Sequence, residues 1–314
     1  MKCVEFKAFN INQYRPKVLL VGNGLFYEDC NWDQLIDDCC SKKNDAEKWK
    51  QFGKLIPYTI RASIACDVDD NERWNQYKQK MDELKTICEK DNSYLAKLLE
   101  LQFDAIITTN YTYQIENSLD KNFTKRSDKY IQNHHFCCTQ PKGDSRFLIH
   151  SFNRINDCEI WHMHGEARRK SSMVLTHDEY GRFSGEVRKY LAGNANYYHD
   201  NSDNLKIKSW IDYLLLGDVY VIGYGADFSE FVFWWMLGRR LREKAGAGAV
   251  YFYEPIENTA ERNNCAKLYA LEKLGVNVLN LGYTFTDKYK DYAAFYNDAI
   301  TDIDGKMGKG KSHA

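Results

Sequence analysis

The sequence predicts an α/β fold, a Rossmann-like doubly wound and mainly parallel sheet with helical insertions. Three apolar, β-branched runs end abruptly in polar or glycine residues, at Val18–Leu25, Ile106–Tyr111 and Ile160–Gly165, and a fourth at Val219–Gly225 repeats the pattern. Buried strands of a parallel sheet have such continuous apolar runs. Predicted helices alternate with these strands, which favours parallel pairing. Ligands bind such sheets at the carboxyl ends of the strands, so we expect these polar groups to meet at one crevice.

The first half of the chain is predicted to contain three strands and two insertions. We expect strands at 17–21, 104–108 and 159–163, with a helix at 111–119. Residues 31–100 are expected to be mostly helical, because apolar residues recur there every three or four positions. These residues are Trp74, Tyr77, Met81, Leu84 and Ile87. Residues 120–158 are polar and are predicted to form an irregular loop insertion.

The second half continues the alternation of strands and helices. Strands are predicted at 172–175, 218–222, 248–253 and 276–279, and helices at 204–216, 228–244, 258–274 and 289–303. Asp227 and Glu230 have the spacing of a capping box at the start of the helix at 228–244. We find no linker or repeat, so residues 1–304 are expected to form one domain. Residues 305–314, rich in Gly and Lys, are expected to be disordered.

The charge balance argues against a nucleic acid as the main partner. Lys plus Arg total 43 and Asp plus Glu total 44, for a net charge of −1. The basic clusters at 168–170 and 239–244 are interpreted as a solvated turn and helix end. We therefore expect no sequence-specific binding of nucleic acid.

The cysteine pattern and the hydropathy indicate a cytoplasmic protein without metal. None of the ten cysteines lies in a C-x-x-C pair, so no structural zinc site is expected. The first residues lack the apolar core of a signal peptide, and no run approaches the ~20 apolar residues of a membrane span. We interpret the cysteines as reduced thiols.

Two glycine turns follow predicted strands. Gly22-Asn23-Gly24 comes directly after the first strand, and Gly223-Tyr224-Gly225 after the strand at 218–222. Glycines there allow backbone N–H groups to approach a pyrophosphate. The full G-x-G-x-x-G pattern is absent, because position 27 is Tyr, so a plain strand-ending turn is the alternative.

Asn110 and Glu254 also follow predicted strands. An Asn side chain both donates and accepts hydrogen bonds, so it can hold a ribose hydroxyl or a water molecule. The alternative is that Asn110 caps the helix that follows. Glu254 is placed to bind ribose hydroxyls, and the alternative is a solvent-exposed strand end.

His162 and His164 are candidate acid–base groups, because a histidine titrating near neutrality is the usual general base. Two alternatives compete: a core histidine bonded to the backbone, and a metal-binding pair, for which no third ligand is evident. The run Phe231–Met236 is apolar around the whole helix and is interpreted as core or as a subunit interface.

The ordered set of motifs resembles the NAD-binding motifs of the sirtuin superfamily. The matching segments begin at Val21, Thr108, His162 and Ile222, and Met173–Phe183 is similar to a segment of the bacterial sirtuin-like branch. The resemblance implies that Asn110 and His164 form the catalytic pair, whereas His162 matches no catalytic position. It implies that the NAD site is lined by Gly22, Asn23, Gly24, Thr108, Gly223, Tyr224, Gly225 and Glu254.

The departures from the family pattern select among its activities. Thr112 stands where the family usually has Asp, and the four-cysteine zinc module of the deacylases is missing. The zinc-free bacterial branch resembles NAD hydrolases of anti-phage defence, which deplete NAD. This likeness implies a homo-oligomer and a separate partner, such as a HerA-type ATPase or an Argonaute. The alternatives are a deacylase or ADP-ribosyltransferase, and a non-catalytic sensor that binds NAD or ADP-ribose.

Hydrolysis of NAD would release nicotinamide and ADP-ribose, with His164 as the base. From the reference pKa of histidine we expect turnover to fall below about pH 6.5.

Overall fold

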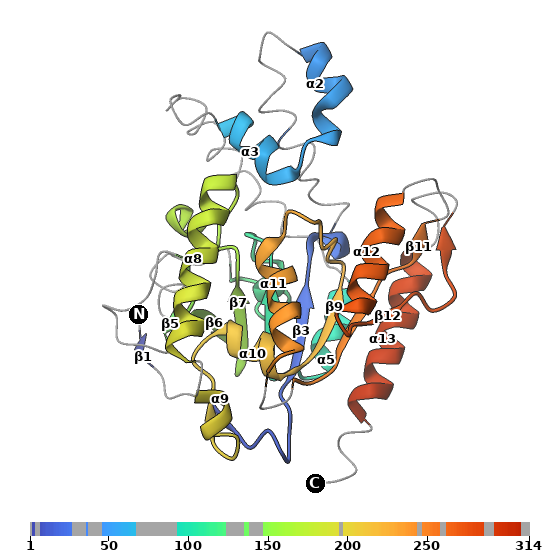
Figure 1. Cartoon of the computed structure of the whole chain (residues 1–314). Helices are drawn as coiled ribbons and strands as arrows, with labels where there is room; N and C mark the ends of the chain where they lie inside the picture. The colour runs from blue at the N-terminus through green and yellow to red at the C-terminus, as the bar shows by residue number, and fades with distance from the viewer. Residues whose placement is uncertain are drawn as a thin grey trace.

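The computed structural model describes residues 2–3, 7–26, 36, 46–66, 93–123, 135–137, 147–194, 197–243, 247–257, 262–285 and 292–308. Within these ranges a nine-stranded sheet has the order β1-β5-β6-β7-β4-β3-β9-β10-β12 (Figure 1). The strands are β1 (Lys2–Cys3), β3 (Lys17–Val21), β4 (Ala105–Thr108), β5 (His135–Cys137), β6 (Ser151–Ile155), β7 (Cys158–His162), β9 (Asp218–Ile222), β10 (Val250–Tyr253) and β12 (Asn277–Leu279).

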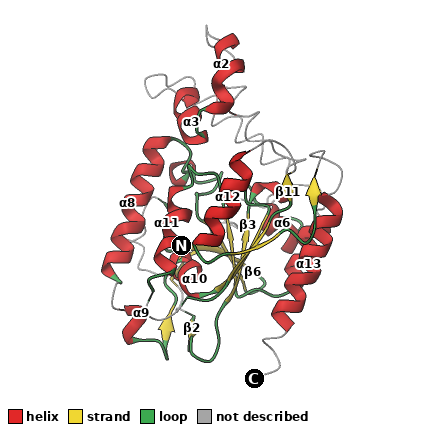
Figure 2. Ribbon diagram, turned by 45° about the vertical axis from the view of Figure 1, so that its right-hand side comes forward, coloured by secondary structure: helices red, strands yellow, loops and turns green. Residues whose placement is uncertain are grey.

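Helices surround this sheet on both faces (Figure 2). They are α2 (Ala46–Phe52), α3 (Tyr58–Cys66), α5 (Ser93–Glu100), α6 (Gln114–Leu119), α8 (His177–Gly193), α9 (Tyr197–Asp200), α10 (Trp210–Leu216), α11 (Phe231–Arg240), α12 (Arg262–Lys273) and α13 (Tyr292–Gly308). Short 3-10 helices lie at Asn23–Phe26, Gly53–Leu55 and Lys170–Ser172. Two further strand pairs join β2 (Ala8–Phe9) to β8 (Leu205–Lys206), and β11 (Ile256–Glu257) to β13 (Thr284–Phe285).

The strands from β7 to β12 are parallel and have the order of a Rossmann-like sheet. From β3 the chain runs outward through β4 to β7, then returns to the other side of β3 at β9. The reversal between β3 and β9 is a topological switch point, where open α/β sheets bind ligands. Val21 pairs with both Thr108 and Ile222, and Thr108 pairs with His162, so these four strands end at the same level.

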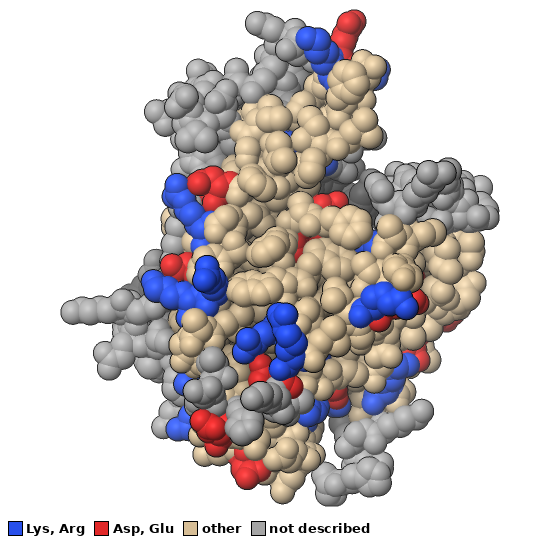
Figure 3. Space-filling model, viewed as in Figure 1, with Lys and Arg blue, Asp and Glu red and all other residues tan. Residues whose placement is uncertain are grey.

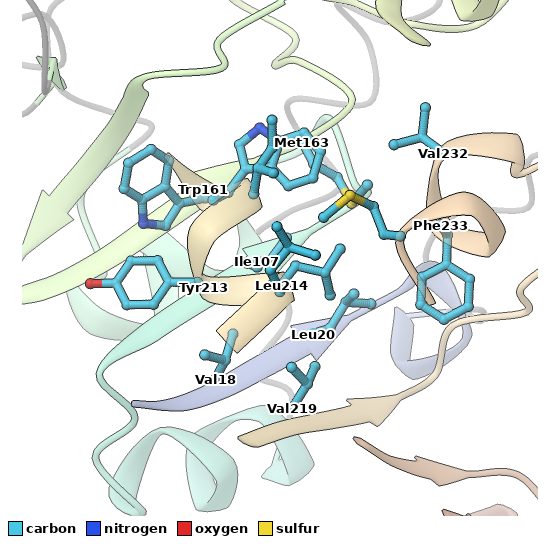
Figure 4. Packing of buried hydrophobic residues seen from close by; sticks show 14 of the residues in the cluster. Val18, Leu20, Ile107, Trp161, Met163, Tyr213, Leu214, Val219, Val232 and Phe233 are labelled. Atoms are coloured by element: carbon cyan, nitrogen blue, oxygen red, sulfur yellow. The ribbon is translucent and has the colours of Figure 1, made fainter. Parts of the chain in front are cut away.

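The alternation of side chains along the strands builds two cores. Val18 and Leu20 of β3, with Ile107, Trp161 and Val219, pack under α8, α10 and α11 (Figure 4). The intervening side chains, Leu19, Val21, Ile106 and Ile160, face the opposite cluster, which includes residues of α5, α6 and α13. Both faces of these central strands are therefore covered, which explains the continuous apolar runs of the sequence.

The predicted strands at 17–21 and 218–222 are confirmed at both ends. The strands predicted at 104–108, 159–163, 248–253 and 276–279 each exist with ends shifted by one or two residues.

The prediction of an irregular loop at 120–158 is wrong for its described part, because β5 and β6 extend the sheet there. β6 pairs antiparallel with β7 through a two-residue turn at Asn156 and Asp157, which both have positive φ. Such a turn matches the twist of a hairpin. The polar residues of β6 concealed this strand, because Ser151 and Asn153 are both buried and Asn153 donates hydrogen bonds to two buried glutamates.

The strand predicted at 172–175 is also absent from the structure. A 3-10 turn ends at Ser172, and helix α8 then begins after Thr176. Thr176 and Glu179 form a reciprocal capping box, which fixes the start of this helix. Helix α8 was not predicted from the sequence pattern.

All five predicted helices have different bounds in the structure. The helix predicted at 111–119 is α6, which begins at Gln114, and the helix predicted at 228–244 is α11, which spans Phe231–Arg240. The helix predicted at 204–216 is shorter, because β8 precedes it and Ser209 caps α10. The helix predicted at 258–274 is α12, and its first predicted turn lies outside the described residues. The helix predicted at 289–303 is α13, which runs on to Gly308 and so enters the segment predicted to be disordered; residues 309–314 are outside the described ranges.

The described part of the 31–100 insertion contains α2, α3 and α5, whereas the predicted stripe from Trp74 to Ile87 lies outside the described residues. In α3, Ala62 and Ala65 belong to the same buried cluster as Tyr111 and Met173. Tyr111 follows β4 and Met173 follows β7 in the sequence. The insertion therefore packs over the edge of the sheet where these strands end (Figure 1).

Charged side chains of both signs are interspersed on the face seen in Figure 3. The predicted apolar run in α11 is divided between core and surface, because Val232, Phe233 and Met236 are buried whereas Phe231 is 57% exposed. Among the described residues, no helix has the length and apolar character needed to cross a membrane.

Candidate active site

The predicted polar segments meet at one edge of the sheet, at the ends of β3, β4, β7 and β9. Backbone hydrogen bonds join them directly. Gly24 N donates to Gly223 O at 2.6 Å, and Met163 N donates to Thr108 O at 3.0 Å. The site is therefore built from four adjacent strand ends at the switch point.

The glycines after β3 and β9 allow the two turns to touch. A Cβ atom on Gly22 would lie 2.4 Å from Gly223 O, and one on Gly24 would lie 2.8 Å from the same atom. Gly223 has a φ of +64°, which favours glycine. A Cβ on Gly225 would meet nothing within 4 Å, so this glycine faces open space.

The backbone amides of Gly22 and Gly24 are used inside the protein. Gly22 N donates to Ile222 O, and Gly24 N donates to Gly223 O. These two N–H groups therefore do not point at a phosphate, in contrast to the sequence-based expectation. The glycines act by letting β3 and β9 end in contact, and Asn23 begins the short 3-10 helix that follows.

Thr108 connects the ends of β3 and β4. Its hydroxyl donates to Val21 O at 3.0 Å and accepts from Asn110 N at 3.1 Å. The side chain is fully buried. Thr108 therefore shapes the backbone that presents Asn110.

Asn110 has a buried side chain whose amide makes no hydrogen bond. The residue is 3% exposed, and neither Oδ1 nor Nδ2 has a partner. Helix α6 starts at Gln114 with Tyr113 at its N-cap position, so Asn110 is not a helix cap. A buried amide without partners costs about 1–3 kcal/mol. A buried polar group without a partner in a native structure requires an explanation, and its place at a strand end makes Asn110 a candidate for contact with a ligand or water.

His164 is equally buried and is held neutral. Its ring lies edge-on to those of Tyr180 and Phe183, with centroids 5.4 and 5.9 Å away. Burial lowers the pKa of His164 to about 3. The imidazole is thus neutral throughout the physiological range, and the expected loss of turnover below pH 6.5 does not follow from this residue.

His162, two residues earlier, has both ring nitrogens occupied. Nδ1 lies 2.7 Å from Asn110 O, and Nε2 lies 2.8 Å from Glu116 Oε1. Both partners are acceptors, so the ring satisfies both when it carries two protons. Burial lowers the pKa of His162, but the attraction of Glu116 and Glu166 outweighs it and raises this pKa to about 9.

A buried polar network continues from His162. Asn153 Nδ2 donates to Glu116 Oε1 at 2.8 Å and to Glu166 Oε2 at 3.1 Å, and Arg169 Nε lies 2.8 Å from Glu166 Oε1. The network reaches the backbone oxygen of Asn110 through His162, and so fixes the backbone that carries the unpaired Asn110 side chain. His162 is thus a structural histidine, and its engaged nitrogens leave no atom for the metal-pair alternative.

Glu230 is a site residue that the sequence analysis missed. Its Oε2 lies 3.3 Å from His164 Nε2, an ion-pair distance, although the orientation does not complete a hydrogen bond. Its Oε1 accepts from the hydroxyl of Tyr180 at 3.0 Å. Burial raises the pKa of Glu230 to about 7, while the hydroxyls of Tyr180 and Tyr224 act in the opposite direction.

The predicted capping box at this position is wrong. Glu230 occupies the N-cap position of α11 and makes no side-chain cap, while Asp227 Oδ1 accepts from Ser229 N. The carboxylate of Glu230 faces the site instead of the helix end. Its spacing from Asp227 concealed this role, and its position just after the Gly223–Gly225 turn was the available signal.

Glu254 follows β10 and is bound by a lysine of α12. Lys267 Nζ lies 2.5 Å from Glu254 Oε1 and donates to Gly225 O at 3.0 Å. The Glu254 side chain is 18% exposed, so it is not the solvent-exposed strand end of the alternative. Lys267 links the end of β10 to the second glycine turn.

Comparison with known protein families accounts for this arrangement. A sequence model described as a SIR2-like domain matches residues 104–279, more than half of the chain. The chain belongs to the SIR2-like family. The matched region contains Asn110, His164, Glu230 and Glu254, whereas the turn at Gly22–Gly24 precedes it. No curated protein matches the chain significantly.

Membership of this family indicates an NAD-related activity, because SIR2-like proteins are in general NAD-dependent enzymes. The described residues contain no group of three or more His, Cys, Asp or Glu side chains placed to hold a metal ion.

Proposed function

We propose that this SIR2-like protein hydrolyses NAD to nicotinamide and ADP-ribose. The observation that carries the proposal is the buried, unpaired amide of Asn110 at the end of β4, beside the strand that leads to the neutral His164. The two residues follow adjacent parallel strands one step from the switch point. Membership of the SIR2-like family is the reason for proposing NAD as the substrate.

The chemistry of the nicotinamide–ribose bond suits these groups. Nicotinamide leaves a cationic precursor as a neutral molecule, so no general acid is needed. The transition state is expected to resemble an oxocarbenium ion. The Asn110 amide would orient the water molecule or the ribose hydroxyls. His164, neutral, would accept a proton from either of them.

The remaining predicted residues are proposed to line the NAD site. These are Gly22, Asn23, Gly24, Thr108, Gly223, Tyr224, Gly225 and Glu254. The open space beside Gly225 and its contact with Lys267 favour this loop as the part nearest the dinucleotide. Gly22, Gly24 and Thr108 would act through the shape of the backbone.

The experiment is an incubation of the purified chain with NAD, followed by chromatographic separation of nicotinamide and ADP-ribose. We expect Asn110→Ala to lose turnover, while its melting temperature stays near that of the wild type, because the amide makes no hydrogen bond. Nicotinamide release that depends on an acylated peptide would replace hydrolysis by deacylation. NAD binding without any product, with or without a partner protein, would replace it by a sensor function.

The biological setting is a further part of the proposal. We propose that the chain is the NAD-depleting effector of an anti-phage defence system in the bacterial cytoplasm, as a homo-oligomer with a separate partner such as a HerA-type ATPase or an Argonaute. Cells carrying the wild-type chain should lose NAD after phage challenge, and cells carrying Asn110→Ala should not. Equal NAD levels in both would contradict the defence role while leaving the hydrolysis assay to decide the activity.

A further inference from the structure

Glu230 belongs to the same cluster of groups as His164, although they are 66 positions apart in the sequence. The distance between His164 Nε2 and Glu230 Oε2 is 3.3 Å. Their side chains are 4% and 13% exposed, so the pair is largely shielded from water. The inference below rests on the proposed hydrolysis of NAD and deepens it.

His164 alone is a weak base in this environment. It is buried, and taking up a proton would place a positive charge in a medium of low polarity. The lowered pKa of His164 reflects this cost. A carboxylate in contact with the imidazole offsets the cost, because it supplies the opposite charge. Glu230 is the acid that the structure places at this distance.

The surroundings of Glu230 hold its carboxylate toward the histidine. Tyr180 of α8 donates its hydroxyl to Oε1, the oxygen that does not face His164. The hydroxyl of Tyr224, after β9, also favours the ionised carboxylate, and Asp227 on the same segment opposes it. Among the described residues, Glu230 is therefore influenced by the imidazole of His164, by the bonded hydroxyl of Tyr180, by the hydroxyl of Tyr224, which completes no hydrogen bond, and by the like charge of Asp227.

We propose that Glu230 is the positioning residue of His164, which fixes the imidazole and balances the charge that it gains during NAD hydrolysis. In that step one O–H bond of the attacking water breaks, and the water oxygen bonds to C1′ of the ribose. The electron pair of the C1′–N bond passes to the nicotinamide nitrogen. The proton passes to His164, and the carboxylate of Glu230 stabilises the resulting imidazolium.

The first test is the pH profile of kcat for the wild type and for Glu230→Gln, an isosteric change that retains an acceptor for Tyr180. In the wild type, kcat should rise with pH through a midpoint near 7, where the Glu230 carboxyl ionises. In Glu230→Gln, kcat at pH 8 should be about 10- to 100-fold lower, the effect of a change of one to two units in the basicity of His164. This variant should show no step near pH 7.

A second variant separates positioning from folding. Tyr180→Phe removes the hydroxyl that favours the ionised form of Glu230, so the midpoint of the kcat profile should move to higher pH. The rate at the alkaline plateau should be nearly retained. Glu272→Gln, an exposed glutamate on α12, is the matched control and should reproduce the wild-type profile.

A third measurement does not depend on turnover. In the free protein, the imidazole nitrogen chemical shifts of His164, followed by NMR, should change near pH 7 in the wild type and not in Glu230→Gln. This response supports the pairing even if the wild type hydrolyses no NAD, in which case the proposed function fails and the pairing stands.

Three outcomes overturn the inference. One is a Glu230→Gln variant with the wild-type rate and profile. Another is a variant with a reduced rate that keeps the step near pH 7, which would assign Glu230 a merely structural role. The third is a set of His164 shifts that do not respond near pH 7 in the wild type, which would have the same meaning.

Discussion

His162 and His164 are two residues apart and almost fully buried, yet the structure gives them opposite properties. His162 is bonded through both nitrogens, and its pKa is raised to about 9. His164 Nε2 makes no hydrogen bond, and its pKa is lowered to about 3. The difference shows that burial alone does not decide the charge of a histidine; the presence of a bonded carboxylate does.

The comparison also distinguishes the residues that hold the backbone of the site in place from the residues proposed to act in the reaction. The side of the site around His162, Glu116 and Asn153 is a hydrogen-bonded network that holds the backbone of Asn110, although Glu116 Oε2 has no partner in it. The side around His164 and the Asn110 amide has polar atoms without partners. We expect changes on the first side to reduce stability and changes on the second side to reduce turnover.

The largest expected effect is on turnover, from His164→Ala. Loss of a general base typically lowers the rate by about 100- to 10,000-fold. The His164 ring is buried against Tyr180 and Phe183, so its removal should also lower the melting temperature, while NAD binding by the folded variant should remain measurable. The measurement is nicotinamide release, with the exposed His177→Ala as control. A wild-type rate in His164→Ala would remove this residue from the mechanism.

The next effect is on stability, from Glu116→Ala. Breaking a buried ion pair by removing one partner costs about 3–5 kcal/mol in the free energy of unfolding. The variant would leave His162 and Asn153 without their shared acceptor. Urea denaturation measures the loss. A change below about 1 kcal/mol would show that the network is not the support inferred here.

The pH dependence of stability should differ on the two sides of neutrality. The pKa of His162 is raised in the folded state. Its contribution to the free energy of unfolding is therefore fully present below about pH 6.5 and is lost as the pH rises through 9. This loss corresponds to about 3 kcal/mol. The pKa of His164 is lowered in the folded state. The contribution of His164 to the free energy of unfolding therefore decreases as the pH falls below about 6.5. Denaturation curves from pH 5 to 10 test both; constant stability from pH 7 to 10 would contradict the charged state of His162.

The smallest effects separate the two glycine turns. Gly22→Ala places a Cβ 2.4 Å from Gly223 O and should lower the free energy of unfolding by about 1–3 kcal/mol. Gly225→Ala meets no atom within 4 Å and should stay within about 0.5 kcal/mol of the wild type, while weakening NAD binding. Thermal unfolding and NAD titration report the two effects. Equal stability of the two variants would mean that the turns are not in contact.

The sequence predicted the framework of the site because its strands are short apolar runs with abrupt ends. The bounds of β3 and β9 follow directly from such runs, and the positions of Asn110 and His164 follow from the ends of β4 and β7. The strand β6 was missed because its polar residues are buried in a network that no local pattern reveals.

Local hydrophobic periodicity and the positions of glycine are enough to predict the α/β class, the four strand ends and the residue types that they present. Which histidine is charged, which amide lacks a partner and where the carboxylate of Glu230 points are set only when the chain is folded. Those properties depend on contacts between residues far apart in the chain, such as His164 with Glu230 and His162 with Glu116. The same side chain is a structural cation or a neutral base according to the neighbours that the fold supplies.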